Sequence, residues 1–190
     1  KCLSNYRSNC VTPITRISVF SIMPLTASHI AILRISLNNI EPEIWRVFTV
    51  PAKIDRAEPH LVLQHVMGWK NVHPHEWEVD EKGGSLRKIA ASLGDTFNYR
   101  YDPKEKWDHT VDVVATGPLS TFLQPFKVLD GEGACPPEDV GGAKGFEKFC
   151  AVMADTKHPK YAEQRAWYGG TFYRAAYNRS SAQKKLDELV

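Results

Sequence analysis

The sequence predicts an α+β protein, in which a mostly antiparallel sheet of about five strands packs against helices in a single compact domain. One reason is that short segments with alternating apolar residues, typical of strands, are separated by turn residues. A second reason is that other segments carry apolar residues at helical spacing. The length of 190 residues suits one domain with a sizeable buried core.

Residues 1–28 are predicted to be a poorly structured extension, and residues 29–190 to form the domain. No acidic residue precedes Glu41, whereas serine, threonine, lysine and arginine recur before it. This composition is found in organelle transit peptides and in disordered extensions, so both interpretations stay open.

The domain begins with a predicted β-hairpin. Apolar residues alternate along residues 29–37, which indicates a strand with one buried face. The segment EIWRVFTV, at 43–50, is rich in β-branched and aromatic residues and lies between Pro42 and Pro51. The short link between the two segments is turn-like, so they are expected to pair.

The middle of the chain is predicted to alternate between helix and strand. Pro59 suits the first turn of a helix that runs to about Gly68. A third strand is expected at 75–79. A helix should follow with Ser85 as its N-cap and Gly94 at its end, because the apolar residues between them recur at helical spacing.

Two further strands are predicted at FNYRY, 97–101, and at WDHTVDVV, 107–114, where large apolar residues alternate with polar ones. The rest of the chain is expected to be loop and helix. The predicted helices there span residues 143–154, 159–167 and 181–190.

The composition makes some classes of function and partner less expected than others. The net charge is +2 and no block of like charges occurs, so nucleic acid is a less expected partner than a protein or a small ligand. The four cysteines form no C-x-x-C pair, which is unlike a zinc knuckle, so we expect reduced thiols in an intracellular, cytoplasmic protein. Organelle targeting by residues 1–28 is the alternative. No run of eighteen apolar residues occurs, so no membrane association is expected.

Four motifs occur in a fixed order: IEPEIWRVFTVPA, HLVLQHVMGW followed by HPHEW, FNYRYD followed by WDH, and GEGACPPEDVGG. Together they resemble the plasmid pRiA4b ORF-3-like family, also described as insertion-element passenger proteins. The resemblance implies an α+β fold and an association with mobile elements, but no mechanism. It also indicates a divergent member, since the turn after Asp102 and the residue at Val128 depart from the family pattern.

The loop GEGACPPEDVGG combines stiff prolines with acids just before a predicted helix. Glu138 and Asp139 are expected to cap that helix, because acids favour the positive end of its dipole. The functional alternative is a cation or amine site at the same two carboxylates. A phosphate site is disfavoured, since the acids would repel it.

Three histidines suggest a second possibility. His73 and His75 point the same way on an extended chain, and His109 shares a strand face with Trp107. If these strands are neighbours, the imidazoles could bind one metal ion, with Asp102 or Asp139 as a further ligand. The alternative is that these are core histidines hydrogen-bonded to the backbone or to the acids.

Cys135 is the last of the candidate site residues. Nearby acids oppose an activated thiolate, so a small buried thiol is expected rather than a nucleophile. The candidate pocket therefore comprises eight residues: His73, His75, Asp102, Trp107, His109, Cys135, Glu138 and Asp139.

These observations favour a non-catalytic binding or accessory module linked to mobile elements, without a cofactor. One alternative is a metal-dependent hydrolase that holds zinc or another divalent metal ion at its histidines. A second alternative is a nucleic-acid-binding module, for which aromatic residues on the 97–101 strand could stack bases.

Overall fold

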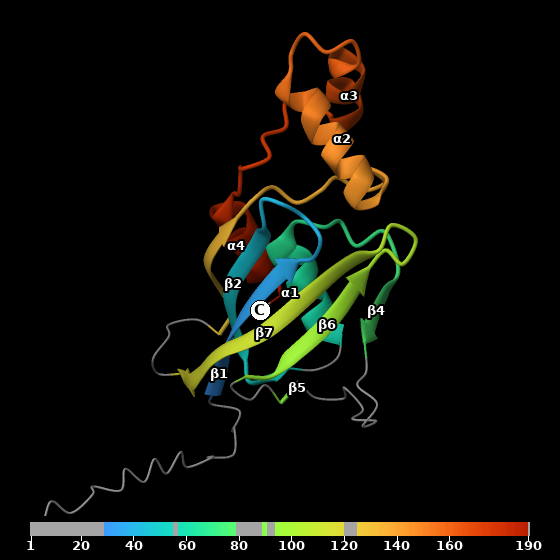
Figure 1. Ribbon diagram of the computed structural model, residues 1–190. Helices are drawn as coiled ribbons and strands as arrows, with labels where there is room; N and C mark the ends of the chain where they lie inside the picture. Colours follow the sequence, from blue (N-terminus) through green and yellow to red (C-terminus); the bar gives the residue numbers. More distant parts are fainter. Residues whose placement is uncertain (1–28, 55–56, 79–88, 91–93, 120–124, 190) are drawn as a thin grey trace, which may run out of the picture.

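The structure is a computed structural model that describes residues 29–54, 57–78, 89–90, 94–119 and 125–189. Its centre is an antiparallel sheet in the order β4-β6-β7-β1-β2-β8 (Figure 1). The strands of this sheet are β1 His29–Leu37, β2 Ile44–Pro51, β4 His75–Glu78, β6 Thr96–Tyr101, β7 Trp107–Pro118 and β8 Lys127–Glu132. The predicted α+β class and antiparallel sheet are confirmed.

The predicted hairpin is β1 and β2, which pair from Ile30 opposite Pro51 to Leu37 opposite Ile44. β7 pairs along the other edge of β1 and brings His109 opposite Leu37. Alternate residues of these strands are buried, as a sheet with one covered face requires. The five predicted strands of the main sheet are therefore all present.

The sixth strand, β8, lies where the sequence predicts only loop and helix. Its sequence KVLDGE offers only two consecutive large apolar residues and no alternation. It forms because β2 presents a free edge, so that Trp45 pairs opposite Glu132. The pairing fixes the start of the acidic loop that follows β8.

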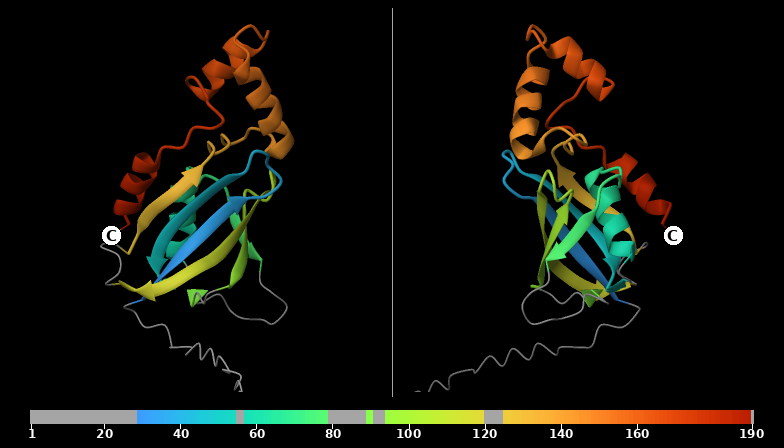
Figure 2. Two further views of the ribbon diagram at one scale, coloured as in Figure 1. Left: turned by 60° about the vertical axis from the view of Figure 1, so that its left-hand side comes forward. Right: turned by 90° about the vertical axis from the view of Figure 1, so that its right-hand side faces the viewer.

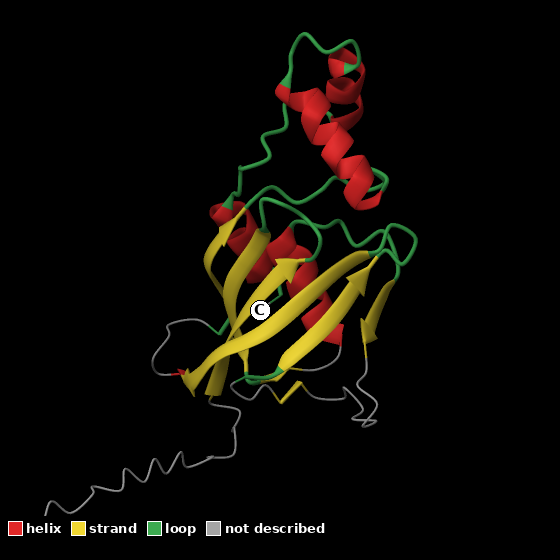
Figure 3. Cartoon of the chain, in the orientation of Figure 1, coloured by secondary structure: helices red, strands yellow, loops and turns green. Residues whose placement is uncertain are grey.

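Two helices cover one face of the sheet. α1, Ala57–Met67, and α4, Arg179–Asp187, lie together on this face, and the turned views show the opposite face free of helices (Figure 2). α2, Gly142–Ala154, and α3, Tyr161–Tyr168, form a separate helical pair beyond one end of the strands (Figure 3). The loops at that end of the sheet join the two parts.

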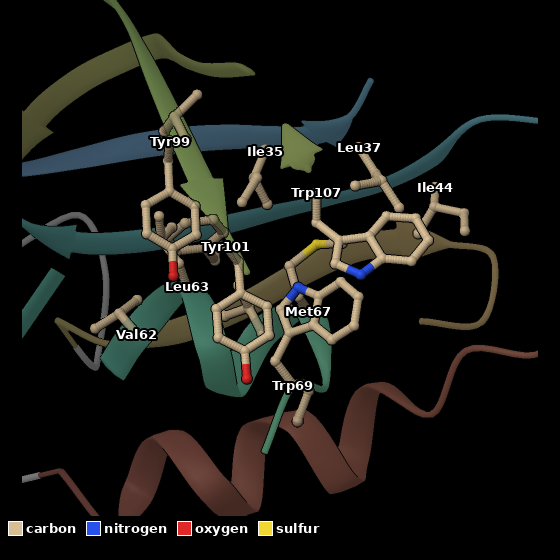
Figure 4. Packing of buried hydrophobic residues seen from close by; sticks show 14 of the residues in the cluster. Ile35, Leu37, Ile44, Val62, Leu63, Met67, Trp69, Tyr99, Tyr101 and Trp107 are labelled. Atoms are coloured by element: carbon tan, nitrogen blue, oxygen red, sulfur yellow. The ribbon is translucent and has the colours of Figure 1, made fainter. Parts of the chain in front are cut away.

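The core lies between the sheet and α1. Figure 4 shows Trp69 and Trp107 side by side, with Met67 and Tyr101 packed around them. The ring centroids of the two tryptophans are 5.5 Å apart, and both side chains are buried. Burial of aromatic side chains of this size accounts for much of the hydrophobic stabilisation.

The helix predicted between Ser85 and Gly94 is wrong where the structure describes it. Ile89–Ala90 is the short strand β5, which pairs with β3, Lys53–Ile54. Backbone pairing with another segment overrides the helical spacing of the apolar residues here. Most of the remaining residues of that prediction lie outside the described part of the chain.

Candidate functional site

Three loops meet at the end of the sheet nearest α2 (Figure 1), and four of the predicted site residues that they carry lie close together. His73 lies between α1 and β4, and Asp102 opens the turn between β6 and β7. Glu138 and Asp139 belong to the loop between β8 and α2. Residues far apart in the sequence are thus brought together at one end of the sheet.

Asp102 is held in place by its own turn. Its backbone is left-handed, with φ 47°, a conformation that aspartate tolerates better than most residues. Its Oδ1 accepts hydrogen bonds from the backbone N–H groups of Lys104 and Glu105, at 3.1 and 3.3 Å. The second oxygen, Oδ2, is left to face His73 Nε2 at 3.7 Å.

Glu138 also uses its two carboxylate oxygens differently. Oε1 accepts hydrogen bonds from the backbone N–H of Lys70 at 2.8 Å and from the hydroxyl of Tyr101 at 3.1 Å. Oε2 is buried without a hydrogen-bond partner and lies 3.8 Å from His73 Nε2. Because the side chain is only 10% exposed, this unpaired oxygen is costly to bury.

His73 faces all three acids. Its Nε2 is buried, has no hydrogen-bond partner, and lies 3.4 Å from Oδ1 of Asp139, whose side chain is 66% exposed. One donor atom each from His73, Asp102 and Asp139 lie within 4.8 Å of one another, which is compatible with a shared metal ion. We call His73, Asp102, Glu138 and Asp139 the acidic histidine cluster.

Tyr101 positions this cluster. Its hydroxyl accepts hydrogen bonds from the backbone N–H groups of Val72 and His73, at 3.0 and 3.3 Å, while it donates to Glu138. Burial is the main cause that raises the pKa of Tyr101 to about 12, so the hydroxyl keeps its proton at neutral pH. Tyr101 therefore fixes two of the three loops relative to each other.

The predicted capping role of Glu138 and Asp139 is wrong. No side chain of the acidic loop caps α2, which begins after Gly141 with φ 97°. Glu105 from the β6–β7 turn accepts from the backbone N–H groups of Gly141 and Gly142 instead, at 2.8 and 3.1 Å. A carboxylate from a distant turn thus takes the place of a local cap and leaves the two loop acids free to face His73.

The other two candidate histidines lie elsewhere. His109 is fully buried, where its Nε2 accepts from Trp69 Nε1 at 3.4 Å and its Nδ1 donates to the carbonyl of Tyr99 at 3.3 Å. Burial lowers the pKa of His109 to about 4. His75 stacks on His60 with ring centroids 3.6 Å apart. Among the described residues, the three histidines do not converge on one point.

Trp107 and Cys135 support the site without acting in it. Trp107 belongs to the core, and its Nε1 donates to Glu105 Oε2 at 3.2 Å. Burial raises the pKa of the Cys135 thiol, which is the setting of an inert cysteine rather than a nucleophile. Cys135 instead lines a cavity of about 480 Å³ between the end of α1, the acidic loop, α3 and α4.

Arg46 also lines this cavity, although the sequence does not single it out as one of the candidate site residues. It points inward from β2 between Ile44 and Phe48, and its side chain is fully buried. An arginine on the apolar face of a predicted strand is the signal that would have found it, because charged residues are rarely buried without a function or a partner. Glu105 and Tyr101, by contrast, carry no such signal in the sequence.

No helix within the described part of the chain is long and apolar enough to cross a membrane.

Comparison with known proteins places the chain in a family. The sequence model of the plasmid pRiA4b ORF-3-like protein family matches residues 29–181. The chain is 34% identical over 177 residues to uncharacterized protein y4hQ of Sinorhizobium fredii, strain NBRC 101917 / NGR234, with coverage of 83% of this chain and 91% of the relative.

A solved structure has a similar fold. The crystal structure of MM3350 from Methanosarcina mazei Go1, titled a protein of unknown function, matches with a TM-score of 0.74 and 26% identity, covering 82% of this chain and 98% of the other. The four motifs, the antiparallel sheet and these similarities together show that the chain belongs to the plasmid pRiA4b ORF-3-like family.

Proposed function

We propose that this protein is a non-catalytic binding module that holds one divalent cation in the acidic histidine cluster. The observation that carries the proposal is the pair of buried, unpartnered atoms, Nε2 of His73 and Oε2 of Glu138, which face each other. Buried polar atoms are normally hydrogen-bonded or bound to metal, so a cation between them would satisfy both.

The spacing of the donor atoms favours an ion. Nε2 of His73 lies 3.4, 3.7 and 3.8 Å from the nearest oxygens of Asp139, Asp102 and Glu138. A charged hydrogen bond spans only about 2.7–2.9 Å. Four ligand atoms about 2.1 Å from a tetrahedral zinc ion would lie about 3.4 Å from one another. The donor atoms of His73, Asp102 and Asp139 lie within 4.8 Å of one another, so a small contraction would bring these three onto one ion. Glu138 does not belong to this group, so its Oε2 would have to move further to become a fourth ligand.

Charge supports the same proposal. Three carboxylates gathered around one imidazole repel one another, and a divalent cation offsets that repulsion. One nitrogen and three oxygen donors suit zinc or manganese better than magnesium, which keeps several waters and prefers oxygen ligands alone. The exposed side chain of Asp139 leaves a path by which the ion can enter.

The position of Glu138 favours a structural role over catalysis. Catalytic zinc sites keep one position open for water or substrate. Oε2 of Glu138, 3.8 Å from Nε2 of His73, could take that position as a fourth ligand beside His73, Asp102 and Asp139. The ion would add to the contacts that already join the three loops, which are made by Tyr101, Glu138 and Glu105 and by the N–H of Asp102 to the carbonyl of Pro74. The family's name links it to plasmids, and an accessory role in that setting agrees with a binding module.

Thermal unfolding of metal-free protein tests the proposal. Zinc or manganese at about one hundred times its dissociation constant should stabilise the folded protein by about 2.7 kcal/mol through linkage, and magnesium should do much less. His73→Gln should abolish the gain. His75→Gln, which changes a histidine two residues away and outside the cluster, should retain it. An equal gain in both variants, or none in the unaltered protein, rules the cation centre out.

A further inference from the structure

The cavity beside the acidic loop has the size and lining of a ligand site. Its volume of about 480 Å³ lies within the range of about 300–1,000 Å³ that is typical of small-molecule pockets. Arg46, Cys135, Trp167, Tyr168, Tyr177 and Lys185 are among the residues that line it. The lining also includes His65, Trp69 and Lys70, so the cavity combines basic side chains with several aromatic rings.

Arg46 places a buried positive charge at this cavity without an acid to neutralise it. Its guanidinium donates to the backbone carbonyls of five residues: Trp45, Val66, Met67, Glu132 and Gly133. Among the ion pairs of the described residues none involves Arg46. The carbonyls solvate the cation but carry no full negative charge, so an anion nearby would be favourable.

Lys185 adds a second positive charge at the same end. Arg46, Lys185 and Cys135 line the cavity together. Burial raises the pKa of the Cys135 thiol; the charges of Arg46 and Lys185 oppose that rise, and the charge of Glu138 adds to it. The acids among the lining residues are Glu138 and Asp139. Oε2 of Glu138 and Oδ1 of Asp139 face His73, which is not among the lining residues. The three arginine and lysine residues of the lining, Arg46, Lys70 and Lys185, outnumber these two acids.

Aromatic rings form the rest of the wall. Tyr177 stacks on Arg46, with its ring centroid 3.7 Å from the guanidinium carbon. Trp167 and Tyr168 on α3 are 49% and 41% exposed, which is unusual for side chains so large. Exposed rings beside a cavity gain most from a flat apolar ligand, because stacking removes both surfaces from water.

We propose that this cavity binds a small organic anion with a planar body. Its anionic group lies at the Arg46 and Lys185 end, and its ring packs against Tyr168 and Tyr177. Because all five N–H groups of Arg46 are used by carbonyls, Lys185 makes the direct contact to the anion and Arg46 acts through its charge. The inference does not depend on an ion in the cation centre, although Glu138 and Asp139 line the cavity as well.

Anilinonaphthalene sulfonate, a planar aromatic anion that fits this volume, is the probe for a fluorescence titration in metal-free buffer. We expect saturable binding of one probe per chain, with quenching of tryptophan emission because Trp69 and Trp167 line the cavity. Lys185→Gln should weaken binding about tenfold, the usual scale for one charge-assisted contact. Lys184→Gln, the same change one residue earlier on an exposed position of α4, should leave it unchanged.

Two further titrations test whether the probe binds through its charge and whether it binds at this cavity rather than at the cation centre. Phenylnaphthylamine, the uncharged counterpart of the probe, should bind more weakly and should not distinguish Lys185→Gln from the unaltered protein. His73→Gln should bind the anionic probe normally, which separates a failure of this site from a failure of the cation centre. Equal effects of the two lysine changes, or no saturable binding in the unaltered protein, would overturn the proposal.

Discussion

At the scale of single residues, identity alone does not decide which acid caps a helix and which histidine faces a carboxylate. Four of the eight candidate residues meet in the acidic histidine cluster. The sequence shows that these four residues are of types that can bind a metal ion, but it does not show that they meet. The roles of Glu105 and Tyr101 depend on loops that meet only after the sheet forms. Such contacts join residues more than thirty positions apart, and no local pattern encodes them.

The protonation of His109 depends on the residues that surround it in the folded protein. Both of its ring nitrogens have protein partners, and burial lowers its pKa from the ordinary 6.5 to about 4. Between these two pH values the unfolded chain takes up a proton that the folded chain does not. The free energy of unfolding therefore falls as the pH falls through this window, and His109 has no such effect above it.

Urea unfolding across this range measures the contribution of His109. The unaltered protein should lose about 3 kcal/mol more than His109→Gln between neutral pH and about pH 4, since each pKa unit corresponds to about 1.4 kcal/mol. Glutamine can still accept from Trp69 but does not titrate. Parallel pH profiles for the two proteins would show that His109 is protonated as readily in the folded state as in the unfolded one.

At the scale of elements, alternation and helical spacing predict those segments whose burial follows their own pattern. The sequence predicts the strands of the main sheet from β1 to β7 because large apolar residues alternate along them. β4 is the weakest case, since His75 and Glu76 are exposed and Trp77 is half-buried. The sequence does not predict β8 and β5, since their pairing depends on a free partner strand rather than on their own residues. The start of α2 was predicted, but the carboxylate that caps it was not.

The cap of α2 gives a direct comparison of two acids. Glu105→Ala should reduce the free energy of unfolding by about 1–2 kcal/mol, because two backbone N–H groups lose their acceptor. Asp139→Gly in metal-free buffer should change it by less than about 0.5 kcal/mol, because the side chain caps nothing and glycine adopts the left-handed backbone of this residue, φ 57°, without strain. Urea unfolding measures both, and the reverse order would restore Asp139 as the cap.

At the scale of the whole molecule, the proposed cation centre and the cavity both lie at one end of the sheet. The acidic loop contributes Glu138 and Asp139 to the proposed cation centre, and the same two residues line the cavity together with Cys135. α1 and the sheet hold this end rigidly through the tryptophan core. Function is thus expected at the loops, where the sequence shows its most specific motif, and stability at the sheet beneath them.

Zinc content after equilibrium dialysis tests the cation centre most directly. Metal-free protein dialysed against zinc and then against metal-free buffer should retain one ion per chain. Asp102→Asn should retain none, because asparagine preserves the turn through its oxygen but removes a charged ligand. Asp112→Asn, the same change at a carboxylate on β7 that accepts from Thr96, should retain one ion. Equal zinc in both variants, or none in the unaltered protein, would contradict the account.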